Sequence, residues 1–407
     1  MNFNSETCIQ CKGRGYCGKP CPILKRFSEF QPKVKTSFSG SSPPEIFVGR
    51  YNYPNVNTGI LAPAEYGQTE EYSMPELWHK KNFSINKILS LRAKLIYGKF
   101  KSNVKDTRKE KRILKTMQEI SLADRKVDTE FILSKPVKKI LNIEKSNPLI
   151  TNSAQLKSAR LQENPHVHKK VDYLTSDTNV KSSIAINELY NSKVNVSNII
   201  KILSAGLLGK KTSRKLVPTR WAITATDDTL SKTLLEKIRY YPEISEILLF
   251  NSEYVGNHYE FLLLPEKFSF EVIEAYMKGS IWNLFSEKIA LSQDYESFNG
   301  RKNYASNVTG AYYTARLALC EYFNNIKKQG ACLVLREERP EYNAPLGVGI
   351  LRECSRQAFT KKPEKFSTIQ EALNKIKTRL KLGIEIFKDI SWLLREYKKQ
   401  KRLGEWF

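Results

Sequence analysis

Four of the seven cysteines stand within the first 21 residues, as Cys8, Cys11, Cys17 and Cys21. Two close pairs of thiolates on tight turns are the usual ligand arrangement of a structural zinc ion. The gaps of two and three residues, with glycines among them, therefore predict a compact four-cysteine zinc knuckle. An iron–sulfur cluster would use the same ligands, and two disulfides are a further alternative that a reducing compartment disfavours.

A second kind of chemistry is indicated by arginines that stand beside aromatic residues. The segment VGRYNYP places Arg50 next to Tyr51. A guanidinium group matches a phosphate in geometry and charge, and a tyrosine ring offers a face on which a base can stack. Arg92, Arg214 and Arg220 are further candidates for phosphate contacts. Taken singly, each arginine is more simply a solvated surface charge.

Weak catalytic candidates follow Arg220 along the chain. If residues 220–226 form a strand, Arg220, Thr224 and Thr226 share one face, and Asp227 and Asp228 lie at its end. Paired carboxylates of this kind could hold Mg²⁺ or Mn²⁺ in an enzyme. Asp228 is more simply the N-cap of the following helix, residues 229–241. Further acids that could join such a site are Glu260, Glu271, Asp294 and Glu296. No phosphate-binding loop or nucleophile elbow signature is present, so catalytic residues stay unknown.

The remaining potential ligands have simpler interpretations. Cys320, Cys332 and Cys354 lie in apolar periodic segments and are expected to be buried core thiols. His166 and His168 alternate in a polar, loop-like segment and are expected at the surface.

Helical and strand-like segments in similar number, without strict alternation, predict an α+β fold. Strands are expected at 46–48, in the hairpin EILLF/YEFLLLP with its turn at Gly256–Asn257, in ACLVLREER, and at the start of LGVGILRECSRQAF. In the first part of the chain, helices are expected at 84–98 with Gly98 as the end, through ILKTMQEISLA, and at 181–190, 198–209 and 268–287. In the last part, helices are expected from TGAYY onward, in the second half of LGVGILRECSRQAF and at 384–400. Another helix is expected to begin at Thr368, because Glu371 stands at capping-box spacing from it.

The chain of 407 residues carries a formal net charge of +25, which favours a polyanionic partner such as nucleic acid. Its start lacks a secretory signal, and no apolar run is long enough to span a membrane. We therefore expect a soluble cytoplasmic protein with no membrane partner. We divide it into a zinc-binding head (1–30), an N-terminal α+β domain (31–288), a C-terminal domain (289–399) and a tail (400–407).

Several unbroken blocks together resemble the archaeal Nre family of DNA-repair proteins. These are the cysteine-rich head, SPPEIFVGRYNYPNVNTGILAP, LRAKLIYG, RKLVPTRWAITATDD, GNHYEFLLLP, YASNVTGAYYTARLA and QKRLGEWF. The resemblance covers nearly the whole chain. It implies a repair-associated protein of two domains, in a family whose members in some cases carry an N-terminal zinc finger and a C-terminal motif that binds the sliding clamp PCNA. It implies no particular reaction.

The tail matches the clamp-binding pattern at each position, with Gln400 as the polar anchor and Leu403, Trp406 and Phe407 as the apolar plug. Residues three apart share a side of a 3₁₀ turn, so Leu403 and Trp406 can enter one pocket together. The alternative is a tail that packs on its own last helix. The neighbouring Lys398, Lys399, Lys401 and Arg402 argue against that alternative, because a basic flank suits an extended, solvated peptide.

The resulting hypothesis is a zinc-bearing DNA-repair protein that binds DNA at the nucleoid and is recruited to PCNA by its tail. A metal-dependent enzyme acting on nucleic acid or a nucleotide, such as a nuclease, is the alternative. An RNA-binding protein is allowed by the charge but disfavoured by the tail.

Overall fold

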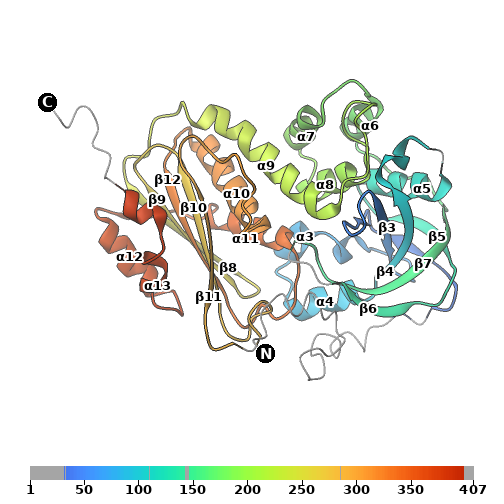
Figure 1. Ribbon diagram of the computed structural model, residues 1–407, viewed down its shortest axis with the longest axis horizontal. Coiled ribbons are helices and arrows are strands. Elements are labelled where there is room, and N and C mark those ends of the chain that lie inside the picture. The colour runs from blue at the N-terminus through green and yellow to red at the C-terminus, as the bar shows by residue number, and fades with distance from the viewer. Residues whose placement is uncertain (1–31, 33, 110, 143–145, 285, 398–407) are drawn as a thin grey trace. The chain divides into compact units, whose positions relative to one another are not determined.

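The computed structural model describes residues 32, 34–109, 111–142, 146–284 and 286–397 (Figure 1). These residues form two compact units. The N-terminal unit comprises the described residues up to Leu230 together with Ala344–Ile350. The C-terminal unit comprises Ser231–Asn343 and the described residues from Leu351 onward.

The N-terminal unit is built on a seven-stranded mixed sheet in the order β1-β5-β7-β4-β3-β2, with β6 paired to β7. Its strands are β1 (Ser37–Ser42), β2 (Ile46–Val48), β3 (Asn55–Ala62), β4 (Ile96–Asn103), β5 (Val127–Leu133), β6 (Lys138–Asn142) and β7 (Ile150–Leu161). Gly40 of β1 closely approaches Pro63, the residue after β3. A Cβ atom at Gly40 would lie 2.2 Å from the carbonyl oxygen of Pro63, so no side chain fits there.

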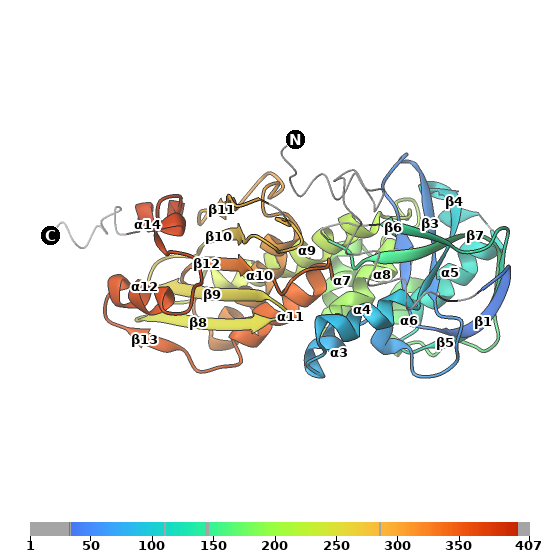
Figure 2. The same cartoon turned by 90° about the horizontal axis from the view of Figure 1, so that it is seen from below.

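The core of this unit lies between the sheet and α5 (Arg112–Leu122), as Figure 2 shows. Leu114, Met117 and Ile120 recur at three-residue intervals on α5 and are fully buried against the strands. The other helical elements of the unit are η2 (Glu70–Tyr72), α3 (Pro75–Lys80), α4 (Ile85–Ala93), η3 (Val104–Arg108), α6 (Lys169–Ser176), α7 (Ser182–Asn191) and α8 (Val196–Ser204). The division between the units falls within α9 (Thr219–Ile238).

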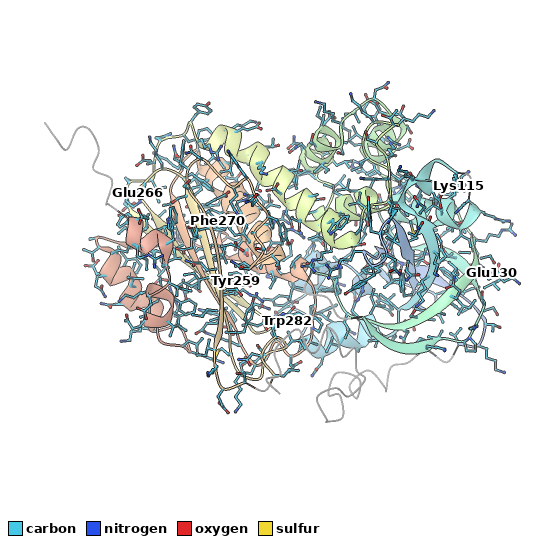
Figure 3. All side chains as sticks on the ribbon, viewed as in Figure 1. Lys115, Glu130, Tyr259, Glu266, Phe270 and Trp282 are labelled. Atoms are coloured by element: carbon cyan, nitrogen blue, oxygen red, sulfur yellow. The ribbon has the colours of Figure 1, made fainter. Side chains whose placement is uncertain are left out.

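The C-terminal unit is built on a six-stranded sheet in the order β11-β10-β12-β9-β8-β13. Its strands are β8 (Ile247–Tyr254), β9 (Asn257–Leu264), β10 (Ser269–Tyr276), β11 (Ala290–Glu296), β12 (Ala331–Glu338) and β13 (Glu364–Phe366). Its helices are α10 (Gly310–Ile326), α11 (Val348–Ala358, whose first three residues belong to the N-terminal unit), α12 (Ile369–Lys377), α13 (Glu385–Lys388) and α14 (Trp392–Glu396). Figure 1 shows α10 and α11 on one face of this sheet and α12 and α13 on the other. Tyr259 and Phe270 lie on the buried central strands β9 and β10 (Figure 3).

Many of the predicted elements are confirmed. The α+β class, the strand at 46–48, the helices at α5, α7, α8 and α10, the strand β12 and the capping box of Thr368 and Glu371 are all present. The predicted hairpin is formed by β8 and β9, although its two turn residues are Val255 and Gly256. Both turn residues have positive φ angles, of 43° and 80°, as the turns that match strand twist require.

The predicted strand at 220–226 is wrong, because these residues belong to helix α9. Pro218 stands just before the helix, and its carbonyl accepts the first hydrogen bonds from Trp221 and Ala222. The β-branched residues suggested a strand, but the buried positions follow a helical period. These positions are Ala222, Ile223, Thr226, Asp227 and Leu230.

The predicted helix at 268–287 is also wrong, because residues 269–276 form β10. An amphipathic helix over these residues would need a solvated polar face, which Glu271 and Glu274 would have to supply. Both are fully buried, one on each face of the sheet, so no solvated face exists.

Other elements differ from the sequence predictions in their extent. The helix predicted at 198–209 ends at Ser204. The helix predicted at 84–98 ends at Ala93, and Gly98 lies inside β4. The strand predicted at the start of LGVGILRECSRQAF is absent from the described elements, since only α11 forms there. The last predicted helix is interrupted at residues 389–391, where Ser391 caps α14 by accepting a hydrogen bond from the Leu394 amide.

The domain boundary predicted at 288/289 does not coincide with the division between the compact units. It falls between β10 and β11, which are hydrogen-bonded neighbours in one sheet. In the described part of the chain, none of the helices combines the length and apolar character that crossing a membrane requires.

Candidate nucleic-acid interface

The loop between β2 and β3 presents aromatic rings to solvent. Tyr51 and Tyr53 are both exposed, and the guanidinium carbon of Arg50 lies 5.3 Å from the centre of the Tyr51 ring. The loop is held by a hydrogen bond from the Gly49 amide to the Asn57 carbonyl, at 2.8 Å. Asn52 takes a left-handed conformation, with φ of 62°, which asparagine tolerates better than most residues. The local sequence therefore keeps the rings on the surface.

The start of α9 brings a third ring to the same place. Trp221 is 46% exposed, and its ring centre lies 5.2 Å from that of Tyr53. The helix start is tied to β2, because the Val48 amide donates a 2.9 Å hydrogen bond to the Thr219 hydroxyl. The segments VGRYNYP and VPTRW, far apart in the sequence, thus form one surface.

Three cations lie in segments that are linked to these rings. Arg220 is half-exposed, and Lys105 and Lys215 are exposed. The segments that carry the lysines are linked to the loop, since the Val104 amide donates to the Pro54 carbonyl and the Leu216 amide donates to the Val104 carbonyl. Within the described residues, none of these three cations has an acidic partner. We call the set the aromatic–basic surface: Arg50, Tyr51, Tyr53, Lys105, Lys215, Arg220 and Trp221.

Such a surface can bind single-stranded nucleic acid without a catalytic group. Aromatic side chains stack on unpaired bases, and neighbouring cations contact the backbone phosphates. Of its members, the sequence singled out Arg50, Tyr51 and Arg220. Tyr53 stands near Tyr51 in the same segment, where the sequence offers it as a second ring for stacking. Trp221 was expected on the core face of a strand, but it is exposed on α9 instead. Lys105 and Lys215 were missed because only backbone hydrogen bonds between distant segments bring them here.

Arg92 is not part of this surface. Its side chain is 1% exposed, and one guanidinium nitrogen lies 3.3 Å from Glu45 and 3.1 Å from the Tyr72 carbonyl. Burial lowers the pKa of Arg92, and the Glu45 carboxylate opposes that change. Lys201 lies 3.0 Å from the other oxygen of Glu45. Arg92 therefore serves the internal packing of the N-terminal unit.

Arg214 is also occupied within the fold. It donates hydrogen bonds to the carbonyl oxygens of Gly209, Thr175 and Asp177, at 2.8, 2.7 and 2.6 Å. These bonds fasten the segment before α9 to the end of α6, so Arg214 is a structural residue.

The weak catalytic candidates do not form the predicted row. Asp227 is buried and Asp228 is half-buried, and both lie inside α9, so neither ends a strand nor caps a helix. Glu260, Glu271, Asp294 and Glu296 are buried, and each is held by an arginine or by backbone amides. Among the described residues, no group of three histidine, cysteine or acidic side chains could hold a metal ion. Cys320, Cys332 and Cys354 are buried as expected, and burial raises the pKa of each thiol.

A cluster of charges is buried in the C-terminal unit. Arg336 pairs with Glu274 and, at 3.0 Å, with Glu338, and the Tyr276 hydroxyl donates to Glu274 at 2.7 Å. Burial raises the pKa of Glu338 to about 7, although Arg336 opposes that change. The side chains of the three charged residues are at most 3% exposed, so the cluster belongs to the core.

The predicted zinc ligands Cys8, Cys11, Cys17 and Cys21 and the tail residues Gln400, Leu403, Trp406 and Phe407 lie outside the described residues. The zinc site and the clamp-binding tail therefore stay predictions.

Comparison with known proteins shows which family of proteins the chain resembles. Residues 16–283 match the model described as "Archaeal Nre, N-terminal", and residues 296–406 match "Archaeal Nre, C-terminal". The chain is 36% identical to "DNA repair protein NreB" of Archaeoglobus fulgidus, over 98% of this chain and 99% of the relative. It is 36% identical to "DNA repair protein NreA" of the same organism, over 92% and 94% of the two chains. It is 33% identical to "DNA repair protein NreA" of Haloferax volcanii, over 89% of each chain. No solved structure matches the chain significantly.

Proposed function

The chain belongs to the archaeal Nre family, and from this premise we propose that it is a DNA-repair protein that binds single-stranded DNA through the aromatic–basic surface. The observation that carries the proposal is the contact of the Tyr53 and Trp221 rings beside Arg220, which has no acidic partner among the described residues. Exposed rings of this size rarely gather on a surface without a partner. Bases of any sequence can stack on them, which suits a protein that acts at damaged or unwound DNA. The net charge of +25 supports a polyanionic ligand.

We further propose that Cys8, Cys11, Cys17 and Cys21 bind zinc and that the tail recruits the protein to PCNA. The cysteine spacing supports the first proposal and the Gln400, Leu403, Trp406 and Phe407 pattern supports the second. The alternative of a metal-dependent enzyme finds no supporting cluster in the described part of the chain.

The DNA proposal is tested by fluorescence anisotropy with labelled oligothymidine. Stacking contributes about 1–3 kcal/mol per base, so Trp221→Ala and Tyr53→Ala should each raise the Kd roughly 5- to 150-fold. Tyr66→Ala is the matched control, since Tyr66 is also an exposed tyrosine of the N-terminal unit, at 58%. Circular dichroism should show unchanged folding, because the rings are largely outside the core. Unchanged affinity in the double variant would refute the surface, and tighter binding of RNA than of DNA would favour an RNA-binding protein.

The tail and zinc proposals need separate measurements. Deleting residues 400–407 should abolish binding to purified PCNA and leave the affinity for DNA unchanged. Clamp binding that survives the deletion would disprove the tail assignment. Metal analysis of anaerobically purified protein should give one zinc per chain, which Cys8→Ser with Cys11→Ser should remove. Iron and sulfide in the same sample would instead identify a cluster.

A further inference from the structure

The N-terminal unit contains a groove that the proposed function does not use. It has a volume of about 780 Å³ and is lined by Asp124, His166, Val167, His168, Lys169, Lys170, Tyr173 and Ser192. The residues come from the turn after α5, the start of α6 and the end of α7. Figure 1 shows α6 and α7 side by side.

One wall of the groove is formed by Asp124 and His166, which are joined through both their backbones and their side chains. The Asp124 amide donates a 3.0 Å hydrogen bond to the His166 carbonyl, and an isolated bridge pairs Ala123 with Val167. The Asp124 carboxylate also accepts from Nδ1 of His166, at 2.8 and 2.9 Å. A carboxylate on Nδ1 fixes the orientation of the ring. Nε2 of His166 is thereby left available, as an acceptor in the neutral ring and as a donor in the imidazolium.

The Nδ1 atom of His168 has the opposite role, as an acceptor. Its Nδ1 accepts a 3.2 Å hydrogen bond from the Lys170 amide at the start of α6. An accepting Nδ1 places the hydrogen of the neutral ring on Nε2. The ring therefore offers an N–H donor, and among the described residues nothing accepts from it.

Two lysines and a tyrosine complete the groove. Lys169 is exposed and has no acidic partner in the described part of the chain. Lys170 lies 2.5 Å from Glu188 and also over the ring of Tyr173, 5.1 Å from its centre. Tyr173 is 61% exposed, so one aromatic face is accessible beside two ammonium groups and two imidazoles.

We propose that this groove binds a nucleotide unit of a DNA strand, with its phosphate between His168 and Lys169 and its base stacked on Tyr173. Cationic and N–H donors match phosphate oxygens, and the tyrosine ring matches a base. The Asp124 carboxylate accepts hydrogen bonds from His166, and Glu188 is paired with Lys170, so the donors that face the groove outnumber the free acceptors. The phosphate is either a strand's terminal 5′-phosphate or an internal phosphodiester. The inference rests on the proposed function for its choice of DNA, but the groove is separate from the aromatic–basic surface.

The test uses the full chain with isotope-labelled histidine. The chain has four histidines, so each ring gives a resolvable NMR signal, and the buried His258 of the C-terminal unit is an internal control. The probes are thymidine, thymidine 5′-monophosphate, and oligothymidine with and without a 5′-phosphate. The signals of His166 and His168 should shift with the monophosphate and with the strand, but not with thymidine. A larger shift with the 5′-phosphorylated strand identifies the terminal phosphate, and equal shifts identify an internal one.

Two variants make the result decisive. The double variant Lys169→Ala, Tyr173→Ala should raise the Kd for thymidine 5′-monophosphate, measured from the histidine shifts, at least fivefold. Lys157→Ala removes an exposed lysine outside the groove and should leave this Kd unchanged. The proposal would be refuted if the signals of His166 and His168 did not shift at a saturating concentration of the strand. It would also be refuted if the double variant gave the same shifts as the parent. Loss of anisotropy in the Trp221 variant bears only on the aromatic–basic surface, so the two proposals can fail independently.

Discussion

Arginines of this protein take opposite roles according to what surrounds them. Arg220 stands beside an exposed tryptophan without an acidic partner in the described residues, whereas Arg92 is enclosed with Glu45. Both occur near apolar residues in the sequence, so their neighbours in the chain do not separate them. Removing one partner of a buried ion pair costs about 3–5 kcal/mol, so Arg92 stabilises the folded state. Arg220 makes no such pair and is therefore available for binding.

Glu338 gives a prediction about pH at the residue scale. Its pKa is about 7 in the folded protein and about 4.3 in an unfolded chain. Between these values the unfolded chain loses a proton that the folded protein keeps, so Glu338 lowers the free energy of unfolding as pH rises through this window. Between pH 5 and pH 8, Glu338→Gln should therefore lose less stability than the parent, by a few kcal/mol.

Urea unfolding at pH 5 and pH 8 measures this effect. The stability difference between the two pH values should shrink in Glu338→Gln and persist in Glu130→Gln, since Glu130 is exposed on β5 (Figure 3). An unaltered difference in Glu338→Gln would show that the buried carboxyl does not retain its proton.

At the scale of elements, a buried carboxylate accepts hydrogen bonds from protein groups and does not contact solvent. Glu271 of β10 accepts from the Ser391 hydroxyl at 2.7 Å and from the amides of Trp392 and Leu393 at 2.8 and 2.9 Å. The first amides of a helix have no partner inside it, so a carboxylate there satisfies them and complements the helix dipole. One strand residue thus fixes the position of α14.

Glu271→Ala should release α14 from the sheet. Leaving these donors unsatisfied costs about 1–3 kcal/mol, so hydrogen exchange at residues 391–397 should become faster while β12 keeps its protection. Glu385→Ala is the control, because Glu385 lies on the exposed side of α13. Unchanged exchange in the Glu271 variant would mean that apolar packing alone holds α14.

At the scale of the whole molecule, the sequence families and the compact units divide the chain differently. The two family matches meet between residues 283 and 296, whereas the units divide within α9. The difference arises because β10 lies in the N-terminal match, β11 lies almost entirely between the two matches and β12 lies in the C-terminal match, yet all three strands pair in one sheet.

A fragment of residues 231–407 should therefore fold by itself, since it contains every described strand of the second sheet. A fragment of residues 289–407 lacks β8, β9 and β10 and should not fold. Circular dichroism and cooperative thermal unfolding distinguish the two. A folded 289–407 fragment would show that the central strands are dispensable.

The sequence by itself determined the family, the basic charge, the α+β class, the buried thiols and several helices, because these depend on local pattern or on long unbroken blocks. It also placed Arg50, Tyr51 and Arg220 among the phosphate-binding candidates. Only the tertiary structure decided that residues 219–238 are helical, that Glu271 and Glu274 are buried, and that Trp221 meets Tyr53. Burial of a charged or β-branched residue depends on partners far away in the chain, such as Arg336 for Glu274, and local periodicity carries no information about them.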